Sequence, residues 1–283
     1  MTVVTDFAVS PLSPIIGAEI HGLDLSQPLS AQAVADVRLA LNTHHVIFFR
    51  DQDLSPAQQA DFARQFGVVT EGHPVLPAIE GNPEVLVIDS REDRASWWHT
   101  DVTFLQAPAF GSILHMLTAP EVGGDTEWAS LQDAYDRLAD PVRALCDSLI
   151  AVHFDPWFAA DVDARGGYEW QGEFHEKLLP AVHPVVRTHP ENGRNGLFVN
   201  PQFTQSILGL SKNESNAVLE MLYRHCQQPE LTCRFRWEPG SVAFWDNRAT
   251  LHYALDDYGD ATRIANRVTL QGDVPYGPAM PQR

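Results

Sequence analysis

Short apolar runs separated by turn residues follow one another from residue 233 towards the C-terminus and limit the folds open to the chain. Four strand-like runs follow one another there, at residues 233–237, 241–246, 252–255 and 264–272. The turn Glu238-Pro239-Gly240 separates the first two. Closely spaced short strands with glycine and proline turns are typical of antiparallel sandwiches and jelly rolls, whereas parallel α/β sheets alternate strands with helices. We therefore expect a fold that is mainly β, with flanking helices.

Helical patterns precede these strands and are expected to cover a sheet. Residues 30–44 begin at a plausible N-cap, Ser30, and continue with apolar residues at helical spacing. Ser55-Pro56 opens a second helix, because proline is favoured at the first helical position. Residues 130–152 are also expected to be helical, with an interruption at Asp140-Pro141.

The length of 283 residues allows one large domain or two small ones, and neither an internal repeat nor a low-complexity linker divides the chain. We therefore expect a single domain over residues 1–283. Within it, the segment of about 153–195 shows no clear periodicity and is rich in histidine, tryptophan and glycine. An irregular insertion of this length is usually a lid or a substrate-binding loop.

The charge of the chain argues against nucleic acid and membranes as partners. Its formal net charge is −18, so the surface repels nucleic acid and anionic lipid, and any anion site must be locally basic. No stretch approaches the roughly 20 apolar residues of a membrane span, and the N-terminus has no signal-peptide pattern. Three cysteines without a CxxC pair fit a reducing compartment, so we expect a cytoplasmic protein.

A histidine two residues before an acidic residue occurs three times, which is little more than chance supplies in a chain with 12 histidines and 37 acidic residues. The pairs are His99/Asp101, His153/Asp155 and His189/Glu191. Turn residues surround the last pair, so its acid is expected to point to solvent, and His153 is expected to be a surface or loop-anchoring histidine. His99 and Asp101 lie in an extended aromatic run, where residues two apart point the same way.

A metal site built on His99 and Asp101 needs a third ligand from a distant part of the chain. His252 is the best candidate, because it opens a strand after a turn. The alternative for His252 is a core histidine whose nitrogens are satisfied by hydrogen bonds. Two imidazoles and one carboxylate are the ligand set that leaves half of the coordination sphere of iron open.

Two arginines follow the third candidate ligand. Arg263 and Arg267 would share one face of an expected strand and lie about 13 Å apart. On an inward face both would need anions, whereas on a solvated edge strand both would lie outside. The motif Gly123-Gly124-Asp125-Thr126 is either a glycine turn or a hairpin that delivers the Thr126 hydroxyl to a carboxylate. With the metal ligands, inward arginines would indicate oxidation by non-haem iron with a 2-oxoacid co-substrate.

Several segments together form a more specific pattern. They are residues 14–20 (PIIGAEI), 98–104 (WHTDVTF), 123–126 (GGDT), 183–190 (HPVVRTHP), 198–200 (FVN) and 245–248 (WDNR), with Arg263 and Arg267. On these segments the sequence resembles the taurine/2-oxoglutarate dioxygenase (TauD/TfdA) family of non-haem Fe(II) enzymes. The resemblance extends over nearly the whole chain and implies a double-stranded β-helix, which is a jelly-roll, cupin-like fold.

The resemblance also implies roles for individual residues, with Fe(II), 2-oxoglutarate and O2 as cofactors. The implied metal and catalytic residues are His99, Asp101 and His252, and the implied co-substrate residues are Thr126, Arg263 and Arg267. The implied substrate-binding positions are His73, Leu76, Ala95, Val102, Phe203 and Arg267. The family chemistry would hydroxylate the carbon next to a sulfonate or sulfate group. It would release an aldehyde with sulfite or sulfate, succinate and CO2, a reaction of sulfur metabolism.

Two positions depart from the taurine enzymes of the family. Leu76 stands where those enzymes have a tyrosine, and Ala95 stands where they have an asparagine. A pocket for an ammonium group should keep polar side chains, because an unpaired buried charge is costly. We therefore expect a small anionic substrate with a sulfonate or sulfate head and a less polar tail. A possible homo-oligomer is the other partner that the family implies.

Three alternatives to this expectation differ in class. A phenoxy- or other carboxylate substrate would use the same chemistry. A halogenase would have a small residue in place of its carboxylate ligand, and the presence of Asp101 sets that alternative aside. A non-catalytic metal- or ligand-binding jelly roll would need no combination of Thr126, Arg263 and Arg267 with a complete ligand triad.

Overall fold

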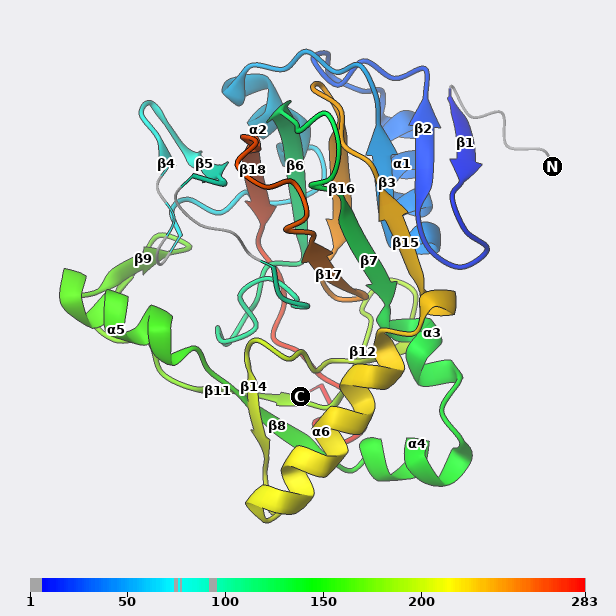
Figure 1. The fold of residues 1–283 in the computed structure, drawn as a ribbon, viewed down its shortest axis with the longest axis vertical. Coiled ribbons are helices and arrows are strands. Elements are labelled where there is room, and N and C mark those ends of the chain that lie inside the picture. Colours follow the sequence, from blue (N-terminus) through cyan, green and yellow to red (C-terminus); the bar gives the residue numbers. More distant parts are fainter. Residues whose placement is uncertain (1–6, 74–75, 77, 92–95, 283) are drawn as a thin grey trace.

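An eight-stranded sheet forms the frame of the molecule (Figure 1). The structure, a computed structural model, describes residues 7–73, 76, 78–91 and 96–282. The strands follow the order β1 (Ala8–Pro11), β2 (Ala18–His21), β3 (Val46–Phe49), β16 (Val242–Asp246), β6 (Gly111–Thr118), β18 (Ile264–Leu270), β5 (Asn82–Asp89) and β4 (Ala78–Ile79). All neighbours are antiparallel except β2 and β3.

A three-stranded sheet packs on one face of the large sheet. Its strands are β15 (Thr232–Phe235), β7 (Thr126–Ser130) and β17 (Thr250–Ala254), with β7 in the middle. Phe48 of β3 stacks on Phe235 of β15 with ring centroids 3.9 Å apart, and Trp128 of β7 lies 5.9 Å from Trp245 of β16. Apolar side chains of both sheets form one buried core. The two facing sheets confirm the expected jelly roll.

Two helices cover the outer face of the large sheet, as the sequence predicted. They are α1 (Ala31–His44) and α2 (Pro56–Arg64). Ser30 and Ser55 accept hydrogen bonds from backbone N–H groups in the first turns of these helices, which satisfies donors that have no partner inside a helix. The apolar faces of both helices pack against inward residues of β3, β6, β16 and β18.

A second layer lies beyond the small sheet. It contains α3 (Leu131–Asp136), α4 (Asp140–Cys146), α6 (Lys212–Cys226), the short helix η1 (Pro229–Leu231), the sheet β11 (Ala181–Pro184)–β8 (Ile150–His153)–β14 (Thr204–Ile207) and the pair β12 (Val186–Thr188)–β13 (Asn195–Leu197). The interruption at Asp140-Pro141 is confirmed, because α4 starts anew at Asp140. The prediction of helix up to residue 152 is wrong, because β8 takes residues 150–153 into a sheet.

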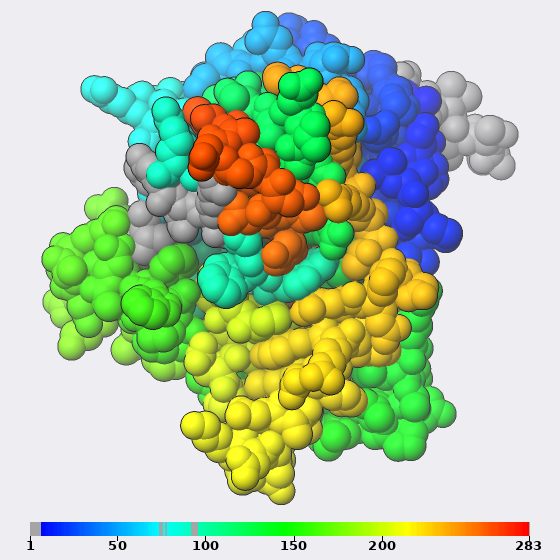
Figure 2. Space-filling model, viewed as in Figure 1, coloured from blue at the N-terminus to red at the C-terminus, as the bar shows by residue number. Residues whose placement is uncertain are grey.

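The segment predicted to be irregular is largely regular, which corrects the expectation for residues 153–195. It contains α5 (Pro156–Arg165) and the hairpin of β9 (Tyr168–Trp170) and β10 (Glu173–His175), followed by β11 and β12. Asp155 accepts hydrogen bonds from the N–H groups of Trp157 and Phe158, and Gly166, with φ 78°, ends the helix. Figure 2 shows residues 156–175 as a green lobe at the left edge of the molecule.

Among the described residues, no helix is both long and apolar enough to cross a bilayer.

Candidate metal centre and active site

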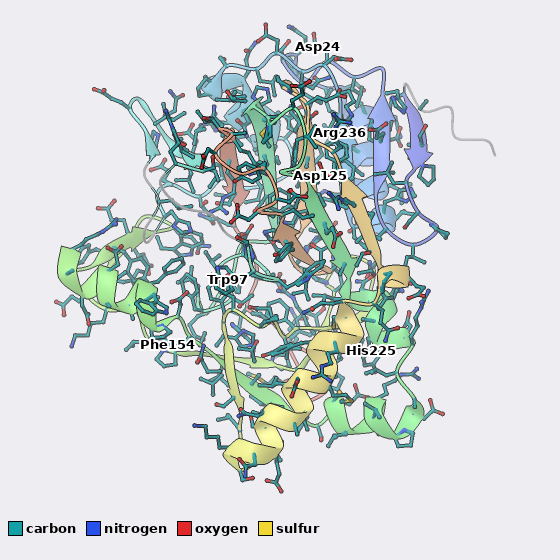
Figure 3. All side chains as sticks on the ribbon, viewed as in Figure 1. Asp24, Trp97, Asp125, Phe154, His225 and Arg236 are labelled. Carbon is teal, nitrogen blue, oxygen red and sulfur yellow. The ribbon has the colours of Figure 1, made fainter. Side chains whose placement is uncertain are left out.

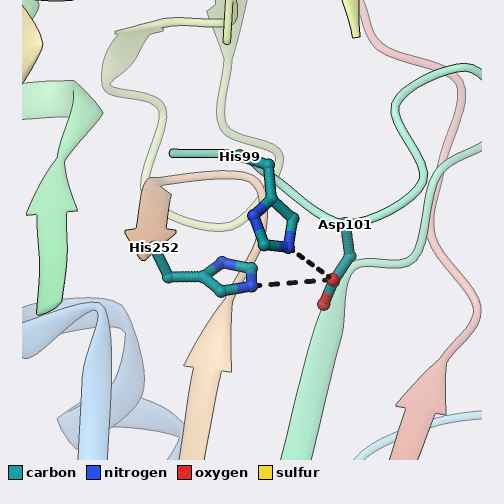
Figure 4. A group of neighbouring side chains, drawn as sticks. All are labelled: His99, Asp101 and His252. Atoms are coloured by element: carbon teal, nitrogen blue, oxygen red, sulfur yellow. Dashed lines mark ion pairs between the residues drawn. The ribbon is translucent and has the colours of Figure 1, made fainter. Parts of the chain in front are cut away.

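Two histidines and one aspartate converge inside the jelly roll (Figure 4). Nε2 of His99 lies 3.7 Å from Oδ1 of Asp101, and Nε2 of His252 lies 3.6 Å from the same oxygen. The three candidate ligand atoms all lie within 4.8 Å of one another, and all three residues are buried. The structure thus brings together the three residues that the sequence proposed as a ligand set.

Backbone pairing places the two histidines side by side. His99 and His252 form an isolated antiparallel bridge, in which each N–H donates to the carbonyl of the other at 3.0 and 2.8 Å. Their rings consequently lie 4.1 Å apart between centroids. Asp101, however, lies in a turn and not in a strand, which corrects the expected extended run. Val102 has φ 48°, so the chain bends there and turns the carboxylate towards the histidines.

The two imidazoles are in the form that binds a metal. The acceptor next to Nδ1 of His99 is the Trp97 carbonyl at 2.7 Å, so Nδ1 carries the proton and Nε2 offers its lone pair. Burial lowers the pKa of His99, and burial together with the neighbouring His99 lowers the pKa of His252 to about 3. Both rings are therefore neutral at pH 7.

The carboxylate is ionised. Burial alone would raise the pKa of Asp101, but the positive charge of Arg267, the two imidazoles and a hydrogen bond from Ser112 outweigh it and lower the pKa overall. Two neutral imidazole nitrogens and one ionised carboxylate oxygen fit a divalent first-row metal such as Fe(II), and such a ligand set would leave half of its coordination positions for other ligands.

Arg263 is a buried cation beside Thr126. Its Nε donates to the carbonyl of Gly124 at 3.1 Å, and Nη2 donates to Oγ1 of Thr126 at 3.3 Å. Nε1 of Trp237 also donates to this hydroxyl oxygen, at 2.9 Å. No ion pair joins Arg263 to a carboxylate within the described residues, and burial, opposed in part by Tyr258 and Asp125, lowers its pKa to about 10. An anion that enters here would meet a buried positive charge without an ion-pair partner among these residues.

Arg267 stands nearer to the metal ligands. Its Nη1 donates to Oδ1 of Asp101 at 3.2 Å, while Nε has no hydrogen-bond partner in the part of the chain that is described. Arg263 and Arg267 expose only 7% and 8% of their surface, so the alternative of a solvated edge strand is wrong. The pairing of β18 with β6 shifts register after Ile264, between the two arginines.

The predicted substrate-binding residues surround the same space. The ring of Phe203 meets the ring of His99 edge to face at 6.2 Å, and Val102 is buried in the apolar cluster around Phe203. Burial, with the positive charge of Arg267, lowers the pKa of His73 to about 3. Leu76 is half-buried, and its N–H donates to Nδ1 of His73. Ala95 lies outside the described residues.

Further aromatic side chains, which the sequence did not single out, pack next to Phe203 and His73. Together with Phe203 they form an aromatic wall. Phe104 lies 5.0 Å from Phe203 and 5.5 Å from Phe158 of α5, measured between ring centroids. The rings of Phe158 and Trp170 each lie 6.5 Å from that of His73. The aromatic run after Asp155-Pro156, which has the pattern of an N-cap and a first helical turn, was the available signal for Phe158.

The other two histidine–acid pairs have structural roles. His153 is fully buried, which corrects the expected surface position, and it anchors a loop through a 3.0 Å hydrogen bond to Oγ1 of Thr103. Glu191 lies exposed in a turn, as expected, and its side chain also pairs with Arg38 and Arg248. Neither pair gathers a third possible ligand in the described parts of the chain.

Fold and site together define a class of protein. A jelly roll that presents two neutral imidazoles, one carboxylate and two buried arginines to one interior space has the ligand set of a mononuclear non-haem iron oxygenase. Comparison with known proteins leads to the same class of enzyme. The model of the family described as "Taurine catabolism dioxygenase TauD, TfdA family" matches residues 8–269.

Individual relatives are similar over nearly the full length. An alpha-ketoglutarate-dependent sulfate ester dioxygenase of Pseudomonas putida is 42% identical over 95% of this chain and 91% of its own. An alkylsulfatase of Acinetobacter baylyi is 38% identical, with 93% and 84% covered. A crystal structure of a taurine dioxygenase from Burkholderia xenovorans superimposes with a TM-score of 0.86 at 45% identity, covering 98% and 93%. The chain belongs to the TauD/TfdA family and is a dioxygenase that depends on Fe(II), 2-oxoglutarate and O2.

Proposed function

We propose that this dioxygenase hydroxylates the carbon next to the sulfate or sulfonate group of a small anionic substrate with an apolar tail. The observation that carries the proposal is the juxtaposition of Arg267 and His73 with an aromatic wall on one side of the ligand triad. The names of the relatives, a sulfate ester dioxygenase and an alkylsulfatase, support the same substrate class.

His99, Asp101 and His252 would hold Fe(II) through Nε2, Oδ1 and Nε2. When bound together, Fe(II), 2-oxoglutarate and O2 supply the oxidising power to replace a C–H bond of the substrate by C–OH, with release of succinate and CO2. The protein contributes geometry: the His99–His252 bridge and the turn at Val102 hold the three ligand atoms on one face before the metal arrives.

Thr126 and Arg263 would bind the distal carboxylate of 2-oxoglutarate. The hydroxyl oxygen of Thr126 already accepts N–H donors from Trp237 and Arg263, so its own O–H proton is free to donate to a carboxylate oxygen. Arg263 would regain in that carboxylate the counter-charge that its buried position lacks.

Arg267 and His73 would receive the anionic head of the substrate. Nε of Arg267 is a buried donor without a partner among the described residues, so a sulfo oxygen could accept from it. The pKa of about 3 keeps His73 neutral at pH 7, so this residue would contribute a hydrogen bond and not a charge.

An apolar tail would lie along Val102, Phe203 and Phe158, with Leu76 at its far end. Residues 156–170 close this side, because Phe158, Val162 and Trp170 pack towards the segment that follows Asp101. We infer that α5 and the β9–β10 hairpin act as the lid of a single domain. Figure 3 places Trp97 between this lobe and the sheets, and Phe154 at the foot of the lobe.

Hydroxylation next to a sulfate ester gives a carbon that bears both OH and OSO3⁻. This product collapses without further oxidation. The hydroxyl oxygen becomes the aldehyde oxygen, the bond between the carbon and the ester oxygen of the sulfate group breaks, and the sulfate leaves with the hydroxyl proton as hydrogen sulfate. A sulfonate would release hydrogen sulfite in the same manner. The task of the protein is to hold one C–H bond towards the metal and to exclude water.

A substrate panel tests the proposal. Succinate and inorganic sulfur release would be measured with Fe(II), ascorbate and 2-oxoglutarate on linear alkyl sulfates, alkyl sulfonates, taurine and a phenoxyacetate, with His99→Ala as the control. Sulfur release with alkyl substrates ahead of taurine is the expected result. Succinate with the phenoxyacetate alone would move the enzyme to carboxylate substrates. Taurine turned over with a lower KM than every alkyl analogue would overturn the apolar-tail proposal.

A further inference from the structure

The two oxygens of the Asp101 carboxylate have different neighbours. Oδ1 faces His99, His252 and Arg267 at 3.7, 3.6 and 3.2 Å. Oδ2 points the other way and accepts a 2.6 Å hydrogen bond from Oγ of Ser112. One oxygen therefore faces the metal position and the other is held by the protein.

Ser112 belongs to a buried polar chain that starts at Trp245. Nε1 of Trp245 donates to Oδ1 of Asn247 at 2.9 Å, and Nδ2 of Asn247 donates to Oγ of Ser112 at 3.1 Å. Nδ2 also lies 3.3 Å from Oδ2 of Asp101. Ser112, Asn247, Trp245 and Asp101 expose no more than 3% of their surface, so water does not compete for these bonds.

The chemistry of each group fixes the direction of the chain. An indole N–H can only donate, so the amide oxygen of Asn247 must face Trp245 and its NH2 must face Ser112. Oγ of Ser112 then accepts from Asn247, which leaves the Ser112 proton for Oδ2 of Asp101. Each member is oriented by the one before it, and the last bond goes to an ionised acceptor, which makes it a strong one.

We propose that Ser112 and Asn247 are positioning residues that hold Oδ2 of Asp101, so that the carboxylate offers Oδ1 alone to the metal. The inference rests on the proposed role of Asp101 as a metal ligand, and it explains why the carboxylate would bind through one oxygen. The pattern Trp245-Asp246-Asn247 then has a function that neither the ligand set nor the co-substrate site explains.

One-oxygen binding matters because of the number of open positions. Two imidazoles and one carboxylate oxygen fill half of a six-coordinate sphere, and the other half must take both donor atoms of the 2-oxoacid and leave a place for O2. A carboxylate free to use both oxygens would fill a position that the co-substrate needs. Without Ser112, therefore, 2-oxoglutarate should bind less tightly to the metal-loaded protein.

The test uses Ser112→Ala, with Ser112→Thr as the variant that keeps the hydroxyl and Ser215→Ala as the matched control. Ser215 lies on the distant helix α6, is equally buried, and accepts a hydrogen bond from the backbone N–H of Ile207 in β14. Calorimetric titration of the Mn(II)-saturated protein with 2-oxoglutarate should show Kd raised about tenfold in Ser112→Ala, the lower end of the effect of outer-shell substitutions. The other two variants should stay within about threefold of the original chain.

The visible absorption of the Co(II)-loaded protein gives the second readout, because it responds to the ligand set and not to stability. The band should change in Ser112→Ala and not in Ser215→Ala. An unchanged band would overturn the proposal even if 2-oxoglutarate bound more weakly. Asn247→Ala provides the same two readouts if Ser112→Ala does not fold. Failure of the ligand assignment looks different: Asp101→Ala would then bind Mn(II) as well as the original chain does.

Discussion

Buried arginines in this protein divide into paired and unpaired ones, and the difference separates structure from function. Arg187 lies 2.5 Å from Asp273, and Arg248 forms a 2.6 Å ion pair with Asp246. Arg263 has only a backbone carbonyl and a hydroxyl within hydrogen-bond reach among the described residues. A buried charge without an ion-pair partner is costly, and the proposed binding of 2-oxoglutarate to Arg263 would offset that cost.

Replacement of Arg263 by glutamine should therefore weaken 2-oxoglutarate binding more than metal binding. Loss of a charged, buried hydrogen-bond partner costs about 2–5 kcal/mol, so Kd for 2-oxoglutarate should rise about 30-fold or more. Calorimetry on the Mn(II)-loaded protein measures this. Arg236→Gln, a matched change at an exposed arginine, is the control. Equal losses in metal and 2-oxoglutarate affinity would contradict the assignment.

His183 supplies a pH-dependent contribution to stability. Its Nε2 lies 2.9 Å from the carbonyl of Thr103, next to the ligand segment, and its ring lies 5.0 Å from that of His153. Burial, opposed in part by this carbonyl, lowers the pKa of His183 to about 4, and burial also holds the pKa of His153 well below its usual value. The unfolded chain binds these protons near pH 6.5, so stability is fully present above that value and is lost as pH falls towards 4.

For His183 alone, unfolding free energy should fall by about 1 kcal/mol between pH 7.5 and pH 5.5. His183→Gln keeps a donor for the Thr103 carbonyl but does not titrate, so urea denaturation of the metal-free protein should show a correspondingly smaller fall. His21→Gln, at an exposed position, should leave the pH dependence as it is. The idea does not survive if His183→Gln retains the full pH dependence.

The residues of the candidate site differ in how far their roles could be predicted from the sequence. The metal ligands and both arginines stand in motifs with recognisable chemistry, and the structure brings them together. Asn247 stands in the segment 245–248, but Ser112, 135 positions away, stands in no recognisable pattern, and the contact between them depends on neighbours across the fold. The turn at Asp101 was also missed, since an aromatic and β-branched run predicts extended structure.

At the scale of elements, α5 shows how the capping of one short helix affects the proposed substrate site. Asp155 accepts from two backbone N–H groups at 2.8 and 3.1 Å, and the first turn that it caps carries Phe158 into the aromatic wall. Few other contacts fix this short helix, because Val162 is its one fully buried residue. Substrate affinity should thus depend on the cap.

Asp155→Ala should destabilise α5 by about 1 kcal/mol, the usual cost of a lost N-cap. Hydrogen exchange of the α5 amides should become faster, and KM for an alkyl sulfate should rise several-fold while KM for 2-oxoglutarate changes little. Asp155→Asn retains an acceptor oxygen and serves as the control. Parallel increases in both KM values would argue against a lid that contacts only the substrate.

Element boundaries were predictable where local chemistry decides them. The N-caps Ser30 and Ser55 start helices where expected, and the late strands β15 to β18 lie within a few residues of the predicted runs. The pieces of the 153–195 segment were not predictable, because strands of three or four residues owe their existence to pairing partners far along the chain. Strand order follows from the same distant pairing.

At the scale of the whole molecule, the site is assembled from both sheets. His252 lies on β17 of the small sheet, Arg267 lies on β18 of the large one, and the segment of His99 and Asp101 bridges to β17. Ligands that join these parts bind the folded chain and not the unfolded one. Metal and co-substrate binding should therefore stabilise the entire fold and not a single loop.

Addition of Mn(II) and 2-oxoglutarate without O2 should accordingly raise Tm. A ligand at a hundredfold excess over its Kd adds about 2.7 kcal/mol of stability, which for a chain of this size corresponds to roughly 5–8 °C. Scanning calorimetry measures the shift, and each variant is compared with its own metal-free form. Asp101→Ala should lose nearly the whole shift, because one ligand is gone. Arg263→Gln should lose only the part added by 2-oxoglutarate, since its metal ligands are intact. If Arg263→Gln abolished the metal-dependent part too, the arginine would be holding the fold together and not the co-substrate.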